Sequence, residues 1–297
     1  DANKKYWYGK NDGMRLSFNY MTKNENNKKA FESVDFRRAI SLASDRTSIN
    51  ESAAFGYLSD DVPTVTGLPA MLSSYMNEDA QALSDPYTKF DIAEAGKILD
   101  EAGFVDKDGD KFRDNPDGTP IAFEIISPAG WSDWNAGAQI IAEDLQEIGI
   151  NATNAPKEIG VVTEAWASGE FDMLYSAYGA NTNIWKFYFD TIGDQSRFLT
   201  STWWSTCQNN YKNDEMTALI EELPQASEER QAEIVETVEK FFAENMINIP
   251  LLFNGKWNVY NDARFTGWTT EEGKGPDPAN CVHDSKILQL MELKPVK

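Results

Sequence analysis

The chain has 297 residues, enough for one large domain or two ordinary ones with a sizeable core. Its 27 Lys and Arg against 48 Asp and Glu give a formal charge of −21, which disfavours nucleic acid and anionic membrane surfaces as partners. The content of 41% hydrophobic and 25% charged residues is typical of a globular protein, and no apolar run reaches the roughly 20 residues of a bilayer span. The single histidine, His283, makes catalytic triads and multi-histidine zinc sites hard to build.

Two further features of the sequence concern the compartment of the protein. Cys207 and Cys281 lie far apart and form no CxxC pair, so they form one disulfide in an exported protein or remain two buried thiols. The chain opens at Asp1 with a polar, charged stretch and no apolar secretory segment. We expect this of a mature protein or of an excised piece.

The first predicted elements are two helices. Residues 34–46 place apolar side chains at every third or fourth position, with Asp35 as the expected N-cap. A second helix is expected after Asp91, which has capping-box spacing to Glu94, and Gly103 is expected to end it.

After a turn-rich loop, the middle of the chain alternates between two periodicities. The predicted elements are a strand around 121–125, a helix that Ser132 or Asp133 caps and Gly149 ends, a strand at 150–153, a helix at 162–168 and a strand at 171–177. This order predicts an α/β lobe with a largely parallel sheet flanked by helices.

The last third contains two predicted helices, with apolar faces from Met216 to Leu223 and from Ile234 to Phe242. A fully apolar run from Ile247 to Phe253 predicts a buried strand that leaves the lobe. We therefore expect one α/β lobe over residues 1–250 and a C-terminal segment over 251–297, with terminal arms.

An aspartate-rich segment, VDKDGDKFRDNPDG, could surround a hard cation such as calcium. Lys111 stands where the EF-hand pattern needs Gly, and Asp117 has a shorter reach than the usual bidentate Glu. Asp and Gly are equally the residues of tight turns, so we predict a structural turn and no metal site. The carboxylates concerned are Asp106, Asp108, Asp110, Asp114 and Asp117.

Carboxylates alone do not predict an enzyme here. A glycosidase needs two of them flanking the scissile bond, and nothing singles out a pair among so many. We therefore predict no catalytic residues, no cofactor and no enzymatic activity.

The segment GWSDWN is the main candidate for a ligand site, because it lies between a predicted strand and the following helix. Ligands of open α/β sheets bind at that edge. The rings of Trp131 and Trp134 can stack on the apolar faces of sugars, while Asp133 and Asn135 can hydrogen-bond hydroxyl groups. The alternative is that both tryptophans pack under the loop.

A second wall of the same cleft is expected after the strand at 171–177. Asn181, Asn183 and Trp185 follow that strand, and Trp203 with Trp204 comes later; packing is the alternative role for these tryptophans. We expect Trp166, which lies in a predicted helix, to belong to the core.

The sequence resembles the bacterial extracellular solute-binding proteins of family 5, the oligopeptide-binding type that serves ABC importers. The segments that carry the resemblance are VDFRRAISLASDR (34–46), FDIAEAGKILDEAGF with DGDKFRDNPDGTPIAFEI (90–124), AQIIAEDLQEIGINA (138–152), ASGEFDMLYSAYGA (167–180), NNYKNDEMTALIEEL (209–223) and INIPLLFNGKWNVY (247–260). The resemblance implies the C-terminal portion of such a protein: a second ligand-binding lobe and the tail that returns to the first lobe. It places the first lobe, signal peptide and lipid-anchor cysteine outside this chain.

The resemblance also bears on the ligand. Peptide binders of the family pair an aspartate after the FDM-type strand with the peptide amino group, whereas residues 178–185 contain no acid and the next one is Asp190. The stretches PAGWSDWNAGAQIIAEDL and ARFTGWTTEEG resemble the branch that binds cello-oligosaccharides. We therefore expect a monomeric, extracytoplasmic receptor that captures an oligosaccharide between two lobes and delivers it to a membrane permease. An oligopeptide or dipeptide receptor is the main alternative; a signalling receptor and a glycan-degrading enzyme are the others.

Overall fold

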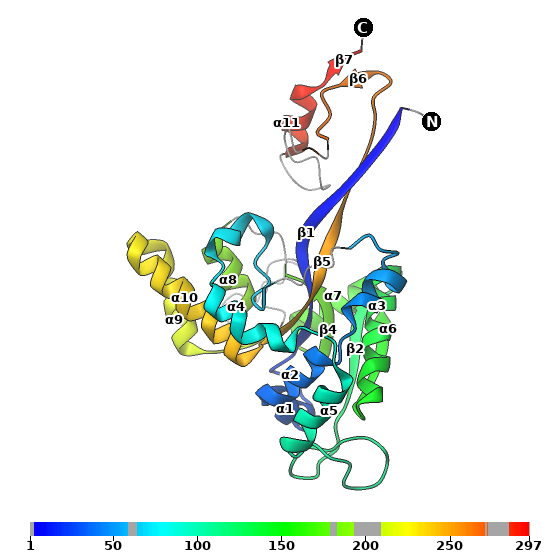
Figure 1. Cartoon of the computed structure of the whole chain (residues 1–297), viewed down its shortest axis with the longest axis vertical. Coiled ribbons are helices and arrows are strands. Elements are labelled where there is room, and N and C mark those ends of the chain that lie inside the picture. Colours follow the sequence, from blue (N-terminus) through cyan, green and yellow to red (C-terminus); the bar gives the residue numbers. More distant parts are fainter. Residues whose placement is uncertain are drawn as a thin grey trace. The chain divides into compact units, whose positions relative to one another are not determined.

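The computed structural model of the protein describes residues 3–58, 64–178, 183–192, 209–270, 272 and 285–296 (Figure 1). The chain forms two compact units. The large unit is Asp12–Phe253, and the small unit combines Asp1–Asn11 with Asn254–Lys297. Among the described helices, none has the length and apolar character needed to cross a membrane.

The large unit contains most of the regular structure. Its helices are α1 (Glu25–Glu32), α2 (Val34–Leu42), α3 (Arg46–Ser48), α4 (Glu78–Ser84), α5 (Ile92–Glu101), α6 (Ser132–Glu147), α7 (Ile159–Ser168), α8 (Ile184–Ile192), α9 (Asp214–Glu222) and α10 (Glu228–Asn245). A π-helical turn, η1 (Ile49–Ala53), and the 3-10 turns η2 (Ala70–Tyr75), η3 (Asp85–Tyr87) and η5 (Leu223–Gln225) connect them. Its strands are β2 (Ala122–Pro128), β3 (Asn151–Lys157) and β4 (Met173–Ala177).

Two long strands, β1 (Lys4–Phe18) and β5 (Asn248–Asn261), contribute residues to both units. The main sheet has the order β3-β2-β4-β1-β5. Strands β2, β3 and β4 are parallel, as predicted, whereas β1 pairs with β4 in the antiparallel sense through Met14 and Ala177. The α/β class is therefore confirmed, but the sheet is mixed because β1, which the sequence analysis treated as an arm, forms an interior strand.

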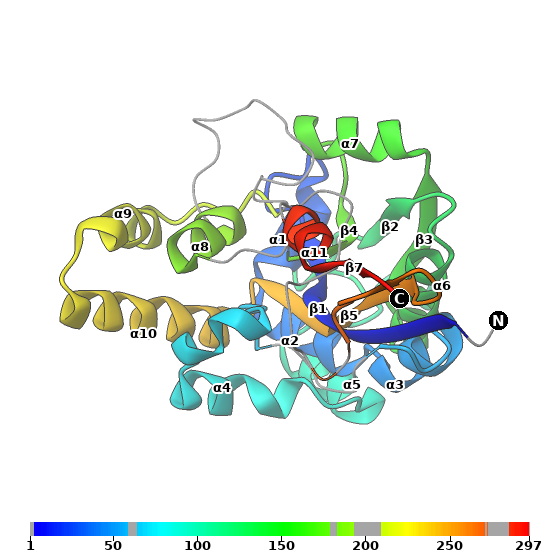
Figure 2. The same cartoon turned by 90° about the horizontal axis from the view of Figure 1, so that it is seen from above.

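The two faces of the sheet are covered unequally. Met173 and Tyr175 of β4 face the main core, which α6 also covers, while Leu174 between them faces the opposite side. On that side α7 contributes Val162 to a small cluster, and Trp166 packs against it. Figure 2 shows α6 and α7 on opposite sides of these strands. The period-2 alternation of the strands produces this two-sided burial.

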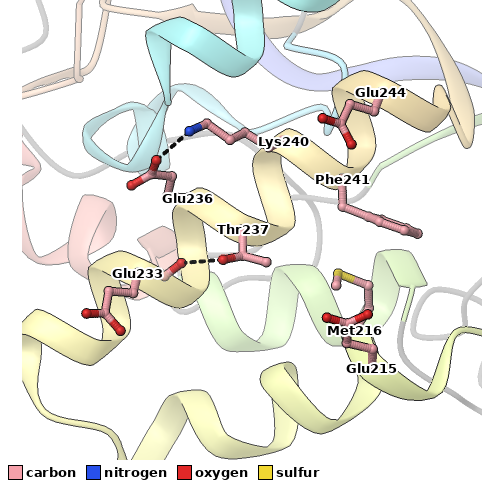
Figure 3. Close-up of a pocket in the computed structure, with 8 residues that line it drawn as sticks. All are labelled: Glu215, Met216, Glu233, Glu236, Thr237, Lys240, Phe241 and Glu244. Carbon is pink, nitrogen blue, oxygen red and sulfur yellow. Dashed lines mark hydrogen bonds and ion pairs between the residues drawn. The ribbon is translucent and has the colours of Figure 1, made fainter.

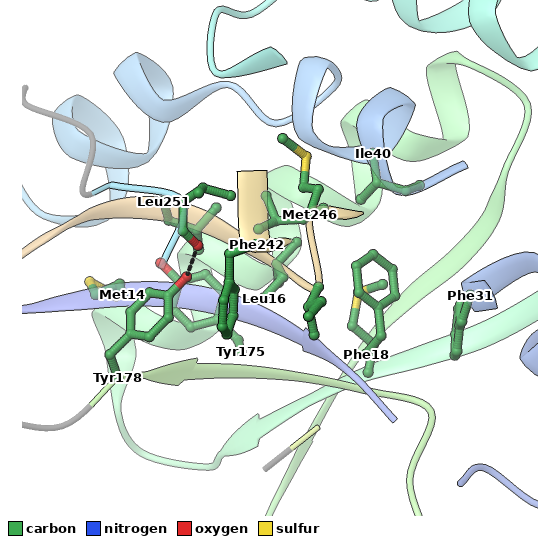
Figure 4. Packing of buried hydrophobic residues seen from close by; sticks show 14 of the residues in the cluster. Met14, Leu16, Phe18, Phe31, Ile40, Tyr175, Tyr178, Phe242, Met246 and Leu251 are labelled. Carbon is green, nitrogen blue, oxygen red and sulfur yellow. Dashed lines mark hydrogen bonds between the residues drawn. The ribbon is translucent and has the colours of Figure 1, made fainter. Parts of the chain in front are cut away.

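The main core is rich in aromatic rings that β1 brings together with distant helices (Figure 4). Phe18 lies 5.2 Å from Phe31 of α1, and Phe31 lies 5.5 Å from Phe123 of β2, measured between ring centroids. All three side chains are buried. Burying such a side chain stabilises the fold by about 1.5–3 kcal/mol, so β1 is an essential part of this core.

Local capping explains where the early helices begin. Asp91 accepts a hydrogen bond from the backbone N–H of Glu94 at 2.9 Å and starts α5, and Gly103 follows its end with a φ of 84°, as predicted. The predicted cap Asp35 is wrong, because Ser33 caps α2 by accepting from the N–H of Phe36.

The start of α6 also differs from the prediction by one or two residues. Trp131 occupies the N-cap position without a side-chain hydrogen bond, and Ser132 and Asp133 lie inside the first turn. Asp133 still suits this place, since a carboxylate interacts favourably with the positive end of a helix.

Candidate functional site

The candidate site lies where the three parallel strands end. We call this the strand-end edge: Pro128 of β2, Lys157 of β3, Ala177 of β4 and the residues that follow each of them. The N–H of Ala129 donates to the Lys157 carbonyl at 2.6 Å, which joins the first two ends. Because ligands of open α/β sheets bind beyond the carboxyl ends of the strands, this is the edge to inspect.

Trp131 and Trp134 have different environments at this edge. Their rings meet edge to face, with centroids 4.8 Å apart and planes at 81°. Trp134 is only 8% exposed and also lies 5.7 Å from the ring of Tyr175, whereas Trp131 is half-buried. Trp134 therefore belongs to the core and supports Trp131, and Trp131 is the ring of the pair that a ligand can reach.

Asn135 fixes the turn that carries Trp131. Its side-chain NH2 group donates to the carbonyls of Pro128 at 2.8 Å and of Trp131 at 2.5 Å. Its own carbonyl accepts from the side chain of Asn154 in β3 at 3.1 Å. Both amide hydrogens of Asn135 are thus used to hold the loop between β2 and α6.

Asp133 is half-buried, and its charge acts on the buried hydroxyl of Tyr175. Burial raises the pKa of Tyr175 well above its ordinary value, and the Asp133 charge adds to this. Gly137 permits the arrangement, because a Cβ atom there would lie 2.5 Å from the Tyr175 hydroxyl oxygen. The charge of Asp133 in the first turn of α6 therefore acts on a buried tyrosine hydroxyl.

The second predicted wall is described in part. Asn183 is exposed and caps α8, with its Oδ1 accepting from the N–H of Lys186 at 3.1 Å. Trp185 is half-buried and stacks on Phe189, with centroids 5.5 Å apart and planes at 25°. Asn181, Trp203 and Trp204, together with Cys207 and Cys281, lie outside the described residues. Strands β2 and β4 are direct neighbours, so Trp131 and α8 leave the sheet from adjacent strand ends.

The structure adds a cation that the sequence analysis missed. Arg15 of β1 is buried, its Nε lies 3.4 Å from Ser176 Oγ, and its guanidinium sits 4.6 Å from the ring centre of Tyr178. Burial raises the pKa of Tyr178, while the positive charges of Arg15 and Arg46 oppose the rise. The signal available in the sequence was an arginine among the apolar and aromatic residues of MRLSFNY.

The aspartate-rich loop forms a turn, as predicted. Asp106 accepts from the N–H groups of Gly109 at 2.7 Å and Lys111 at 3.0 Å, and Asp114 accepts from Lys107 N–H at 2.8 Å. Carboxylate oxygens of Asp106, Asp108 and Asp114 lie within 4.8 Å of one another. The loop's own amides account for the positions of these carboxylates.

A groove of about 480 Å³ lies between α9 and α10 (Figure 3). Its rim carries Glu215, Glu233, Glu236 and Glu244, and Lys240 pairs with Glu236 at 2.5 Å. Of the residues predicted for ligand binding, none that the structure describes lines it. The groove therefore belongs to the helical surface of the large unit and is separate from those residues.

A comparison with models of protein families identifies the family of this chain. Residues 1–198 match the model of the bacterial extracellular solute-binding proteins, family 5 middle region. The chain belongs to this family. The family resemblance that we drew from the sequence is thereby confirmed.

Solved structures agree with this assignment at the level of the fold. A periplasmic oligopeptide-binding protein of an oligopeptide ABC transporter from Thermotoga maritima, bound to mannohexaose, is 23% identical with a TM-score of 0.78, covering 97% of this chain and 53% of that one. The oligopeptide-binding protein AppA from Bacillus subtilis, in complex with a nonapeptide, is 20% identical with a TM-score of 0.73, covering 99% of this chain and 53% of that one. The chain thus spans about half the length of these structures.

One curated relative is similar over a shorter region. The protein YejA of Escherichia coli K12, described as uncharacterized, is 27% identical over 142 residues, which is 48% of this chain and 22% of that protein.

Proposed function

We propose that this chain is the second ligand-binding lobe of an ABC-importer receptor, together with the tail that returns to the first lobe. In this proposal residues 1–250 form the lobe and 251–297 the returning segment. Family membership and the fold shared with receptors of about twice this length support it. The receptor would act outside the cytoplasm as a monomer, bind without catalysis and deliver its ligand to a membrane permease.

The proposed ligand is an oligosaccharide, similar to a cello-oligosaccharide. The observation that carries this proposal is Trp131, a half-buried indole at the strand-end edge. Its ring packs edge to face on Trp134, and its backbone carbonyl accepts a hydrogen bond from the Asn135 side chain. A braced flat ring suits the CH faces of a sugar, because stacking gains little if the ring must first be ordered. The likeness to a mannohexaose-bound protein is in keeping with such a ligand.

Further contacts are proposed from both sides of the edge. Asp133 and Asn183 would hydrogen-bond hydroxyl groups, and Trp185 would add a second stacking surface, with Asn181 and Trp203 as additional candidates. Closure of a two-lobed protein on a ligand is a hinge motion, so further contacts would come from the other lobe.

A peptide ligand is the second candidate, and the nonapeptide bound to the similar protein AppA favours it. Residues 178–185 contain no carboxylate for a peptide amino group. A buried ammonium without such a partner is costly, so this candidate needs an acid from elsewhere.

Tryptophan fluorescence, titrated with cello-oligosaccharides of increasing length and in parallel with a mixed peptide pool, tests the proposal. We expect a saturable shift with the sugars that Trp131→Ala abolishes. Trp166→Ala is the matched control, since Trp166 of α7 packs against the small cluster that contains Leu174 and should leave the sugar response intact. A response to peptides alone would contradict the oligosaccharide, and release of product from a chromogenic β-glucoside would contradict a purely binding function.

A further inference from the structure

Helix α10 buries a carboxyl group among apolar side chains. Glu239 is 2% exposed and lies on the inner face of the helix. The other buried residues of that face are Ile234, Val235, Val238, Phe242 and Ala243. An ionised group in such surroundings is costly unless hydrogen bonds compensate, so its contacts need an explanation.

Two hydroxyl groups from separate elements meet this carboxyl. The Tyr188 hydroxyl of α8 donates to Oε1 at 2.6 Å, and the Thr66 hydroxyl donates to Oε2 at 2.9 Å. Within the described part of the chain, no basic side chain forms an ion pair with Glu239. The carboxyl therefore joins α8 to the segment 64–68 through neutral donors alone.

Both joined elements adjoin the strand-end edge. Helix α8 begins at the cap Asn183 and carries Trp185. In the segment 64–68, Gly67 lies against the ring of Tyr178 so closely that a Cβ would be 2.3 Å from it, and the Tyr178 hydroxyl donates to the Val65 carbonyl at 3.3 Å. Tyr178 directly follows β4. Glu239 thus connects α8 and the segment 64–68, the two elements next to the end of β4.

The contacts of Glu239 can be satisfied in either protonation state. The hydroxyls of Thr64 and Thr66 are 2.8 Å apart, and either can donate to the other. When Glu239 is ionised, Thr66 donates to it and Thr64 donates to Thr66. When Glu239 carries a proton on Oε2, it donates to Thr66, which in turn donates to Thr64, so no hydrogen bond is lost.

We propose that Glu239 is a positioning residue for the strand-end edge, whose carboxyl holds α8 and the segment 64–68 together more firmly when it is protonated than when it is charged. The hydrogen bonds are kept in both states, and only the charged state carries the cost of burial. Opening of either element lets water reach the carboxylate and removes that cost. The relevance of this to ligand capture rests on the proposed function.

The sign of the effect follows from linkage. Burial raises the pKa of Glu239 to about 7, against the opposing hydrogen bonds of Tyr188 and Thr66. A hydrated glutamate titrates near 4.3, so the closed arrangement binds a proton more tightly than the opened one. The elements are therefore held more firmly as pH falls from about 8 towards 5.

Other groups around the carboxyl contribute to its field. Tyr188 interacts electrostatically with Tyr75 of η2, and Tyr178 with the cations Arg15 and Arg46. Lys240, next to Glu239 on α10, interacts electrostatically with Asp79 of α4 and with Glu244. Tyr178 and Tyr188 are buried, and burial raises the pKa of both phenols further from this pH range. Burial instead brings the pKa of Glu239 into the range.

Peptide-resolved hydrogen–deuterium exchange at pH 6 and pH 8, corrected for intrinsic exchange rates, tests the proposal without a ligand. We expect the protection of 64–68 and 184–192 to be about ten-fold higher at pH 6 in the unaltered protein. Glu239→Gln should show equal protection at both pH values. Glu236→Gln, an exposed carboxyl on the same helix, should retain the full pH dependence.

Several results would overturn the role of Glu239. These are equal protection at both pH values in the unaltered protein, persistence of the difference in Glu239→Gln, and an equal difference in α5, which would show an effect on the whole unit. Thr66→Val keeps the shape of the side chain and removes one donor. It should lower the protection of 64–68 at both pH values, and an unchanged protection would contradict the proposed contact.

The same pair of pH values separates this inference from the ligand assignment. We expect cellohexaose to bind about three-fold or more tightly at pH 6 than at pH 8, and Glu239→Gln to remove the difference. Absence of sugar binding at both pH values would contradict the proposed ligand, and the exchange experiment would still decide the role of Glu239.

Discussion

The large and small units use amphipathic helices in opposite ways. In the large unit, Ala95 and Leu99 of α5 are completely buried in the core. In the small unit, α11 (Ser285–Glu292) leaves Ile287, Leu290 and Met291 between 60% and 74% exposed. The same spacing of apolar residues thus produces a helix in both places, but among the described residues the large unit buries that face and the small unit leaves it exposed.

The small unit attaches α11 by its polar side. Gln289 is buried, donating to the Gly267 carbonyl at 2.9 Å and accepting from the N–H of Thr269 at 2.9 Å. Two short strands, β6 (Phe265–Thr266) and β7 (Lys294–Pro295), pair beside it. A helix held by its polar side presents its apolar side outward, which agrees with our proposal that this segment returns to the first lobe.

The largest effect is expected in the core of the large unit. Phe31→Ala removes a ring that contacts both Phe18 and Phe123, and we expect the free energy of unfolding to fall by about 3–5 kcal/mol in urea titrations. Phe55→Ala is the control, because Phe55 is 80% exposed, and should change stability by less than about 0.5 kcal/mol. Similar losses in both variants would contradict the core described here.

A pH titration of unfolding sharpens the comparison, because the large unit buries a carboxyl. The pKa of Glu239 is raised to about 7, so its ionisation opposes folding above that pH and not below the pKa of the unfolded chain. We expect the free energy of unfolding of the unaltered protein to gain on the order of 2–3 kcal/mol between pH 8 and pH 5 relative to Glu239→Gln. Parallel curves for the two proteins would contradict the raised pKa of Glu239 in the folded protein.

Two helical glycines give a smaller, matched pair. A Cβ at Gly137 of α6 would meet the Tyr175 hydroxyl, whereas one at Gly160 of α7 meets nothing within 4 Å. Gly137→Ala should cost about 1–3 kcal/mol through overpacking. Gly160→Ala should leave stability unchanged or raise it by up to about 1 kcal/mol, and thermal unfolding of both variants measures the difference.

The smallest effect on stability is expected in the small unit. Leu290→Ala should alter the free energy of unfolding by less than about 0.5 kcal/mol, because the side chain is 65% exposed. The same change should reduce binding of a hydrophobic dye to the native protein, since it removes part of an exposed apolar surface. A loss of several kcal/mol would mean that α11 packs against a partner, and the contrast between the units would then be wrong.

Local signals in the sequence predicted most elements of the large unit. The cap at Asp91 and the glycine after α5 fix that helix without reference to the rest of the chain. Strand β1 could not be predicted in this way, because polar residues interrupt its alternation and its partner β4 lies about 160 residues later. Arg15 is buried only because that distant pairing places it next to Ser176 and Tyr178.

The candidate site was predicted at the level of the loop and not of the individual ring. The sequence offered Trp131 and Trp134 as equivalents, and the position at which α6 begins separates them. Trp134 falls four residues before Ala138 and joins the buried stripe, while Trp131 stays at the N-cap. The orientation of Asn135 towards backbone carbonyls depends on the turn geometry, which residue types alone do not specify.

The place of β1 in the sheet also constrains the order of assembly during synthesis. Strand β1 precedes both of its sheet neighbours, β4 and β5, in the sequence, so neither neighbour exists until residues 173–177 and then residues from 248 onward have been made. Until both neighbours are made, β1 has unpaired edges, and the side chains up to Phe18 that the folded protein buries are exposed. Pairings so distant in sequence also form slowly. A nascent chain stalled before Asn248 would therefore keep an unpaired strand edge that can pair with other chains. We expect a chaperone that holds unfolded chains to bind it.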